Sequence, residues 1–521
     1  MSANTRKGWK WVIPISALAI FFGLFCASPG FSEIVPKGKL VYVSATAAFE
    51  ATGGDPHTAW GGQSMQTVNT VIHEALMVKK QDGRVYPALA KTWKFAADLS
   101  HITITLDKRA KFHNGEPVTA ADVKFSYDRA ARPELKFALG GYLRMFIDRV
   151  EVVNKHKVVV HFKIPWATFV DGALGVGIIP KAYTEKVGDK EFAKHPIGAG
   201  PFKWLDFKQD DYWEAEAVAD HYRKVPYIKF LRHMQVAEDA TRLAMLKTGE
   251  ADMAGLAMAQ IGEVKKDSNL RVQMTKYGSL RSISFFDMAF PDKASPWHDI
   301  RVRKALDYAI DRESICKYVL HGTAEPWGDV LAPYNPGYDP TIKPRPYDPK
   351  KARQLLKEAG YPNGFKTTLT TNLFSKAQTE AIAALLRDVG IIAKLNIPEE
   401  ATWASLVMER KLSGIGSMPG PWWGGYIHPS AALTQLMQGN AWGYVTTPEQ
   451  HAGVMTMMGM VDEKALAVEA KKVSKFYREQ MTRINLWARH SPDALGPRIA
   501  YWESVPGFSY ASLFEYLKLK D

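Results

Sequence analysis

The sequence predicts an α/β protein that is longer than one ordinary domain. Strand-like and helix-like stretches follow one another along its 521 residues, an alternation that is typical of α/β architecture. Two helical stretches are well defined. Apolar residues recur at helical spacing from Asp299 to Ile310, and a second helix begins at Asp348-Pro349 and ends before Gly360. Chains of this length usually divide into two or three lobes.

The first half of the chain mixes strands and helices. Thr119, with Asp122 three residues later, is a capping-box pattern that predicts the start of a helix. Asn114-Gly115 is a turn signal just before it. The other predicted elements are strands at 40–44, 102–106 and 150–162, the last folded around a turn at 154–157, and helices at 67–77 and 239–248.

Residues 1–32 have the pattern of a cleavable secretory signal peptide. A positively charged start is followed by an uncharged apolar run from Trp11 to Ala27, and the small residues Gly30 and Ser32 suit cleavage after Ser32. The run is short for a membrane span of about 20 residues. An uncleaved N-terminal anchor is the alternative.

The two cysteines limit the covalent chemistry of the chain. Cys26 lies in the leader and raises a lipoprotein alternative, but Phe25 stands where lipoprotein signals carry a small residue. Once the leader is removed, Cys316 is alone and cannot form an intramolecular disulfide. Cys316 lies beside apolar residues in a helical pattern, so we interpret it as a buried small hydrophobe.

Composition and motifs argue against several classes of protein. The formal charge is +13, and the leader's three positive charges account for part of it. The remaining Lys and Arg are scattered among acids, so we expect no nucleic-acid partner. The passage HPIGAGPF contains Gly198 and Gly200 but has Lys203 where a dinucleotide fingerprint needs its third glycine. Neither GxSxG nor HExxH occurs.

Several passages resemble the extracellular solute-binding proteins of family 5, the peptide, nickel and opine receptors of ABC importers. Within 295–364 these passages read RVRKALDYAIDR, LHGTAEPW and YDPKKARQLLKEAGYPNGF. The block 82–130 follows the order of motifs in that family, and HPIGAGPFKWLDF resembles the return of its chain to the first lobe. The resemblance covers nearly all of the chain after the leader.

The resemblance implies an α/β, two-lobe, periplasmic-binding-protein-like fold of type II. Among binding proteins of this type, it implies the cluster of large members, which have an extra inserted subdomain. The implied domains are a signal peptide at 1–32, a discontinuous lobe I at 33–76, 191–275 and 491–521, its inserted subdomain at 77–190, and lobe II at 276–490.

The resemblance also implies a function. Family 5 proteins are receptors that bind a small solute between their lobes and deliver it unchanged to the transmembrane subunits of an ABC permease. We therefore expect a monomeric periplasmic receptor, with no enzymatic activity and no cofactor, for a peptide-like, opine-like or sugar-conjugate solute. A secreted hydrolase and a receptor for a nickel-type metal–chelator complex are the alternatives.

The passage SMPGPWWGGYIHPSAAL, 417–433, is the main candidate for ligand binding. Trp422, Trp423 and Tyr426 supply flat apolar area, and the glycines let a ligand approach the backbone. In peptide receptors a similar passage reads W-x-x-D-Y-x-D-P. Gly425 and His428 stand here in place of the two aspartates. The first of these aspartates pairs with the ligand's α-ammonium in that family, so the resemblance implies weak binding of simple dipeptides.

Other candidate residues can be interpreted either as ligand contacts or as purely structural residues. Trp60 resembles the first-lobe loop that reaches the ligand, and its alternative is surface packing. Arg281 is suited to clamp a carboxylate or phosphate, or else forms a structural ion pair. Asp287 is a candidate partner for an amine, and Trp403 is either a ligand contact or core. His428 has no nearby His or Glu at helical spacing, so we predict no metal site.

Overall fold

The computed structural model describes residues 34–45, 53–58, 67, 69–137, 139–290, 292, 294–420, 427–437, 443–508 and 511–520. The chain divides into two units, Met1–Ile34 and Val35–Asp521, and every element named below belongs to the second. The predicted leader lies outside the described residues. In the part of the chain that is described, no helix has the length and apolar character needed to cross a bilayer.

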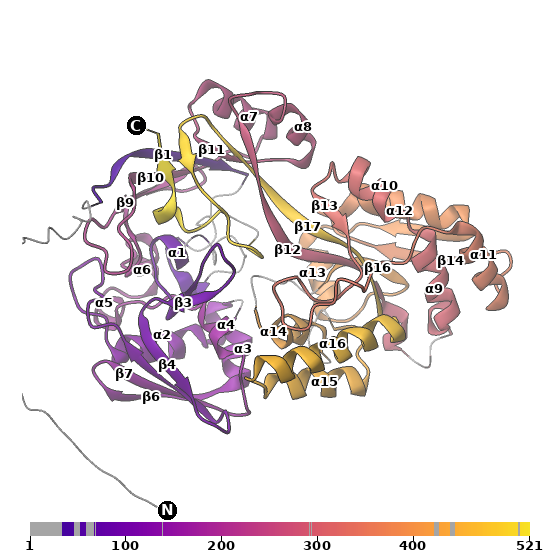
Figure 1. Ribbon diagram of the computed structural model, residues 1–521, viewed down its shortest axis with the longest axis horizontal. Helices are drawn as coiled ribbons and strands as arrows, with labels where there is room; N and C mark the ends of the chain where they lie inside the picture. The colour runs from indigo at the N-terminus through magenta and orange to yellow at the C-terminus, as the bar shows by residue number, and fades with distance from the viewer. Residues whose placement is uncertain are drawn as a thin grey trace, which may run out of the picture. The chain divides into compact units, whose positions relative to one another are not determined.

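The largest sheet among the described residues has 11 strands and combines segments from both halves of the chain (Figure 1). Its order is β15-β14-β16-β12-β17-β11-β1-β10-β9-β8, and β13 pairs with β17. The strands are β1 (Lys37–Ser44), β8 (Phe202–Lys208), β9 (Tyr212–Ala217), β10 (Ile228–Gln235), β11 (Met253–Gly255), β12 (Arg271–Phe285), β13 (Ala324–Pro326), β14 (Phe365–Thr370), β15 (Ile391–Asn396), β16 (Ile415–Pro419) and β17 (Arg483–Leu495).

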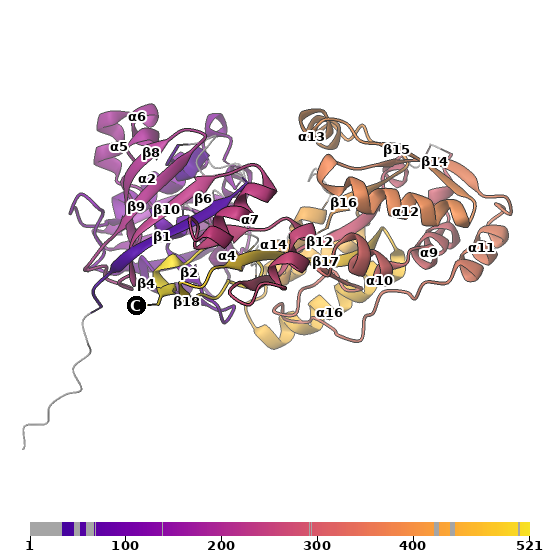
Figure 2. The same ribbon diagram turned by 90° about the horizontal axis from the view of Figure 1, so that it is seen from above.

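The long antiparallel strands β12 and β17 connect the two parts of this sheet (Figure 2). On one side β17 pairs with β11, and β11 runs parallel to β1. On the other side β12 pairs with β16, and β16 runs parallel to β14. The register of β12 against β17 shifts between Thr275 and Ser279, where Tyr277 has a φ of 58°. The predicted lobe boundary at 275/276 falls at this shift, and the boundaries themselves stay a prediction.

A separate four-stranded antiparallel sheet lies in the range predicted for the inserted subdomain. Its order is β4 (Ala90–Phe95), β5 (His101–Leu106), β7 (Lys157–Phe162) and β6 (Ile147–Asn154). Alternate residues of β5 and β7 are fully buried, as a sheet with one core-facing side requires. Two short pairs complete the sheets, β2 (Met77–Lys79) with β3 (Val85–Pro87) and β18 (Ile499–Tyr501) with β19 (Lys518–Leu519).

Several helices begin where their capping residues predict. Thr119 and Asp122 form the expected capping box at the start of α2. The side chains of Asp299 and Asp348 accept backbone hydrogen bonds at the starts of α9 and α11. The helices are α1 (Asn69–Val71), α2 (Ala120–Ala130), α3 (Gly140–Phe146), α4 (Phe169–Ala173), α5 (Lys181–Val187), α6 (Asp189–Lys194), α7 (Asp239–Thr248), α8 (Ile261–Val264), α9 (Ile300–Ala309), α10 (Arg312–Ser314), α11 (Pro349–Glu358), α12 (Lys376–Asp388), α13 (Glu400–Met408), α14 (Pro429–Leu433), α15 (Pro448–Met458) and α16 (Glu463–Gln480).

Most of the predicted elements are confirmed. The helices predicted at 299–310, 349–359 and 239–248 are α9, α11 and α7, and the strands predicted at 40–44 and 102–106 are β1 and β5. The predicted strand pair at 150–162 is β6 and β7, joined at 155–156. Cys316 is 4 % exposed and packs among apolar residues that cover β12 and β14, as its apolar neighbours predicted.

The helix predicted at 67–77 is wrong. Among the described residues of this stretch the α-helix spans only Asn69–Val71, and Met77 begins β2. The carbonyl of Ile72 accepts a hydrogen bond from the N–H of Gly200, at 3.0 Å. The backbone around Ile72 therefore pairs with a distant segment, and this tertiary contact overrides the helical spacing of the apolar side chains.

Candidate functional site

The carboxyl ends of the parallel strands β14 and β16 form the edge where a ligand site is expected. Ligands of open α/β sheets bind outside these ends. β16 ends at Pro419, and the N–H of Gly420 donates to the carbonyl of Leu280, at 2.6 Å. Trp422, Trp423, Gly425 and Tyr426 follow directly in the chain. These four residues, and Trp60, lie outside the described residues, so their predicted roles stay predictions.

Arg281 lies on β12 at this edge of the sheet. It pairs with Pro419 of β16 and with Trp487 of β17. Its side chain is 5 % exposed. Burial, and to a smaller degree the neighbouring Arg489, lowers the pKa of the Arg281 guanidinium to about 9.

Asp287 lies after the other end of β12, where its carboxylate is bonded inside the protein. It accepts hydrogen bonds from the N–H of Gly414, at 2.9 Å, and from the hydroxyl of Ser295, at 2.8 Å. The ring of His298 donates to the backbone carbonyl of Asp287, at 3.0 Å. These contacts fix the turn between β12 and the segment that leads to α9.

Trp403 lies in α13 with its side chain in the core. It is buried in an apolar cluster with Phe286, Val407 and Tyr444. This position corresponds to the core alternative for Trp403. The cluster also includes Met418 of β16, so it supports the strand that leads to the candidate ligand loop.

His428 begins α14, and both of its ring nitrogens are bonded within the protein. Nδ1 accepts from the hydroxyl of Ser430, at 2.9 Å, and Nε2 donates to the carbonyl of Met460, at 3.0 Å. Burial lowers the pKa of His428 to about 4, so the ring is neutral at pH 7. His428 thus holds the chain end of the candidate loop in place.

Asp171, from the predicted inserted subdomain, reaches the same loop end. Its two oxygens accept from the N–H groups of Ile427, at 3.0 Å, and His428, at 2.9 Å. Burial raises the pKa of Asp171 to about 6, against the lowering effect of these two hydrogen bonds. The contact joins residues predicted for lobe II to a residue predicted for the inserted subdomain, and no local pattern in the sequence indicates it.

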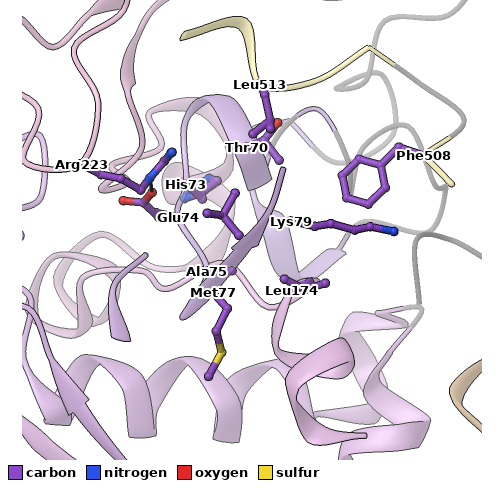
Figure 3. A pocket seen from close by; sticks show the side chains of 11 residues that line it. Thr70, His73, Glu74, Ala75, Met77, Lys79, Leu174, Arg223, Phe508 and Leu513 are labelled. Atoms are coloured by element: carbon purple, nitrogen blue, oxygen red, sulfur yellow. Dashed lines mark hydrogen bonds and ion pairs between the residues drawn. The ribbon is translucent and has the colours of Figure 1, made fainter. Parts of the chain in front are cut away.

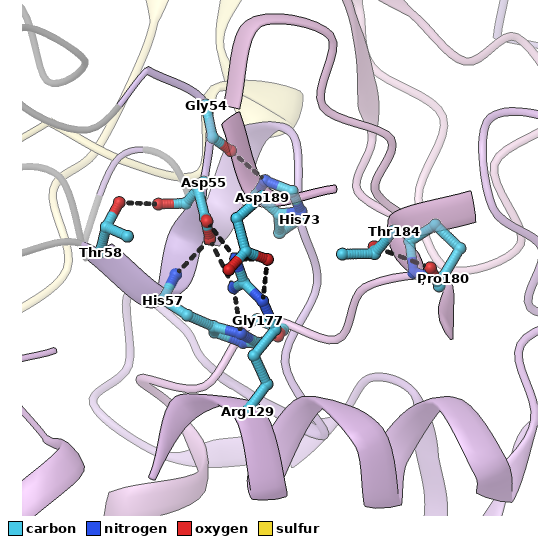
Figure 4. Close-up of polar contacts among 10 residues, drawn as sticks. All are labelled: Gly54, Asp55, His57, Thr58, His73, Arg129, Gly177, Pro180, Thr184 and Asp189. Atoms are coloured by element: carbon cyan, nitrogen blue, oxygen red, sulfur yellow. Dashed lines mark hydrogen bonds and ion pairs between the residues drawn. The ribbon is translucent and has the colours of Figure 1, made fainter. Parts of the chain in front are cut away.

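A buried ion-pair network anchors the segment that precedes Trp60 (Figure 4). Arg129 of α2 is 0 % exposed and pairs with Asp55 through Nη1 at 2.9 Å and Nη2 at 2.5 Å. It also donates to Asp189, at 2.9 Å, and to Nδ1 of His57, at 3.0 Å. Burial by itself would raise the pKa of Asp55, but Arg129 holds it below its usual range. The network therefore fixes 55–57 against α2 and α6.

A small hollow near α1 and β2 is lined by charged side chains that already have partners within the protein (Figure 3). Glu74 pairs with Arg223 and accepts from the hydroxyl of Tyr222, at 2.6 Å. Burial would raise the pKa of Glu74, but Arg223 and its other partners lower it to about 2. Lys79 donates to the carbonyl of Pro506, at 3.0 Å. These contacts join segments far apart in the sequence, so we interpret the hollow as structural.

Metal-ligating residues do not gather in the described ranges. No group of three or more His, Cys, Asp or Glu side chains there is placed to hold a metal ion. The site geometry consists of a sheet edge with a buried arginine and a loop end held by Asp171 and His428.

Asp493 of β17 is a buried carboxylate that should make stability depend on pH. It accepts from the hydroxyl of Tyr42, at 3.4 Å, and burial raises its pKa to about 7 from an ordinary value of 3.8. The folded state therefore binds this proton more tightly than the unfolded state. Protonation of Asp493 contributes fully to the free energy of unfolding below about pH 4. This contribution is lost as the pH rises to about 7, by at most about 1.4 kcal/mol per pH unit.

We expect Asp493→Asn to become more stable, relative to the unmodified protein, as the pH rises from 5 to 8. Urea unfolding at several pH values measures this difference. Asp148→Asn, at an exposed position, is the control and should show no such trend. A constant difference between Asp493→Asn and the unmodified protein across this range would contradict the prediction.

Comparison with known proteins identifies the family. Residues 84–444 match the model of the bacterial extracellular solute-binding proteins, family 5. The chain belongs to this family. The match begins just before β3, includes Arg281 and the whole candidate loop, and confirms the resemblance seen in the sequence.

Relatives of this family 5 protein share its sequence and its fold. The glutathione-binding protein GsiB of Pectobacterium atrosepticum is 33 % identical over 365 residues, 69 % of this chain and 67 % of the relative. NikA from Brucella suis, solved with Fe(III)-EDTA, has a TM-score of 0.81 at 21 % identity, covering 93 % and 100 % of the two chains. The periplasmic binding protein DppA from Helicobacter pylori, solved with the peptide STSA, has a TM-score of 0.77 at 21 % identity, covering 93 % and 98 %. These structures confirm the two-lobe binding-protein fold.

Proposed function

We propose that this family 5 protein is the periplasmic receptor of an ABC importer and binds a small peptide-like organic solute. The match over 84–444 carries the proposal, because it includes both the Arg281 edge and the candidate loop. The likeness to GsiB makes glutathione the first solute to test. In this proposal the leader at 1–32 exports the protein, which acts as a monomer, delivers the solute chemically unchanged, and has no enzymatic activity.

Solute binding is tested with the protein that begins at Glu33. Tryptophan fluorescence and small-angle scattering are measured with glutathione, dipeptides, opines, sugar conjugates and nickel–histidine. We expect one organic solute to quench or enhance the fluorescence and to make the scattering profile more compact. Gly425 supplies no charge for an α-ammonium, so simple dipeptides should bind weakly. If none of these compounds changes either signal, the receptor proposal fails.

Trp422→Ala is expected to weaken solute binding by roughly tenfold or more, as the loss of a large aromatic contact does at the centre of an interface. The melting temperature of the ligand-free protein should stay nearly unchanged, because we propose that Trp422 faces the solute. Trp297→Ala is the control. Trp297 is fully buried in the core, so its loss should lower the melting temperature strongly. A similar drop for Trp422→Ala would make Trp422 a core residue instead.

A further inference from the structure

Arg281 is a buried cation whose guanidinium lacks polar partners in the described part of the chain. Two of its nitrogens, Nε and Nη1, are buried there without a hydrogen-bond partner. Arg303 offers a direct comparison because it is also 5 % exposed. Its Nη1 donates to the carbonyls of Trp297, at 2.7 Å, and His298, at 2.9 Å. A buried charge that lacks such partners is strongly destabilising, so Arg281 needs a partner from outside the described residues.

Other buried polar atoms at the same edge of the sheet also have no hydrogen-bond partner among the described residues. Arg281 pairs with Pro419, and Ile283 pairs with Ser417, so Arg281 and Ser417 point to the same side of the sheet. Ser417 is buried, and its hydroxyl has no hydrogen-bond partner in the described ranges. The same holds for the side-chain oxygen of Asn372, just beyond the end of β14. The carboxyl edge of these strands therefore presents two guanidinium nitrogens, a hydroxyl and an amide oxygen that have no hydrogen-bond partner among the described residues.

The charge at this edge is positive. Arg489 lies near enough to lower the pKa of Arg281, second to the effect of burial. No salt bridge within the described residues involves Arg281. A planar guanidinium with two free N–H groups matches the two oxygens of a carboxylate in a bidentate pair.

We infer that Arg281 binds a carboxylate group of the solute, with Ser417 as a hydrogen-bonding neighbour. This inference rests on the proposed receptor function and narrows the solute to an organic acid. Binding of the carboxylate supplies the counter-charge that the buried guanidinium lacks. The carboxylate oxygens would accept hydrogen bonds from the Arg281 guanidinium and from the Ser417 hydroxyl, which have no other partner among the described residues.

Ligand-free stability gives the first test. Arg281→Met removes the uncompensated charge and keeps a side chain of similar length, so we expect it to melt at a higher temperature than the unmodified protein. Arg303→Met is the matched control and should melt at a lower temperature, because three backbone carbonyls lose the hydrogen bonds that Arg303 donates. If Arg281→Met melts lower, as Arg303→Met does, Arg281 is a structural residue and the inference is overturned.

The second test uses sodium succinate as a carboxylate probe, against sodium chloride at equal ionic strength. We expect succinate to raise the melting temperature of the unmodified protein and of Arg303→Met, but not of Arg281→Met. Arg281→Lys should respond weakly, because a lysine cannot make the bidentate pair. An equal response of the unmodified protein and Arg281→Met overturns the inference.

Glutathione and its dimethyl ester separate this inference from the proposed function. We expect the ester, which has no free carboxylate, to bind the unmodified protein at least tenfold more weakly than glutathione. Arg281→Met should bind both compounds equally weakly. Tight binding of glutathione by Arg281→Met would leave the receptor function standing and overturn the role of Arg281. If no solute binds the unmodified protein, the receptor proposal fails, while the succinate measurement still decides whether Arg281 holds a carboxylate.

Discussion

Arg129→Met is expected to lower the free energy of unfolding by about 3–5 kcal/mol, the usual cost of breaking a buried ion pair from one side. Asp55 is 1 % exposed and would be left buried without its counter-ion. His57 would lose the donor to its Nδ1 as well. Urea unfolding followed by circular dichroism measures the loss.

Lys124→Ala is the matched control, because Lys124 lies on the same helix in the exposed ion pair with Asp128. Its loss should cost no more than about 0.5 kcal/mol. The double variant Asp55→Asn/Arg129→Met should recover part of the stability, since it leaves no buried carboxylate at position 55. A loss for Arg129→Met no larger than that for Lys124→Ala would show that the network contributes little to stability.

Gly198→Ala is expected to destabilise the protein by about 1–3 kcal/mol or more, because the added methyl group has no room. A Cβ at position 198 would lie 1.9 Å from the backbone carbonyl oxygen of Ile72. Backbone atoms cannot rotate away as a flexible side chain does, so the segments around Ile72 and Gly198 would have to separate. Thermal unfolding measures the effect.

Gly262→Ala is the control for this prediction. Gly262 lies in α8, and a Cβ there would meet no atom within 4 Å. The stability of Gly262→Ala should be unchanged or higher by up to about 1 kcal/mol. Equal stability of Gly198→Ala and the unmodified protein would mean that the close approach of the two segments is not required.

Elements with local signals could be predicted from the sequence. Asp299, Asp348 and Thr119 each cap a helix at the expected position because capping depends on atoms within three or four residues. The stretch 67–77 carried an equally regular apolar spacing. Its structure could not be predicted from that spacing, because the carbonyl of Ile72 accepts a hydrogen bond from the N–H of Gly200, more than 120 residues away.

In the candidate site, too, local features could be predicted from the sequence and contacts between distant segments could not. The resemblance in the sequence was enough to predict the family, which is confirmed, and to choose Arg281 and the loop 417–433 as candidate site residues. The lack of hydrogen-bond partners for the Arg281 guanidinium among the described residues could not be predicted, because it depends on which side chains β16 and β17 place beside it. The pairing of Asp171 with the N–H groups of Ile427 and His428 joins positions about 256 residues apart, and no local pattern indicates it.

The burial of Cys316 simplifies labelling of this protein with thiol-reactive probes. Its side chain is 4 % exposed, and burial raises the pKa of its thiol to about 12, so little thiolate is available to react at pH 7. A protein that begins at Glu33 contains no other cysteine. A cysteine introduced at an exposed position would therefore take a maleimide dye selectively, with the native residue left in place, and a pair of such dyes would report distances within the chain as solute is added.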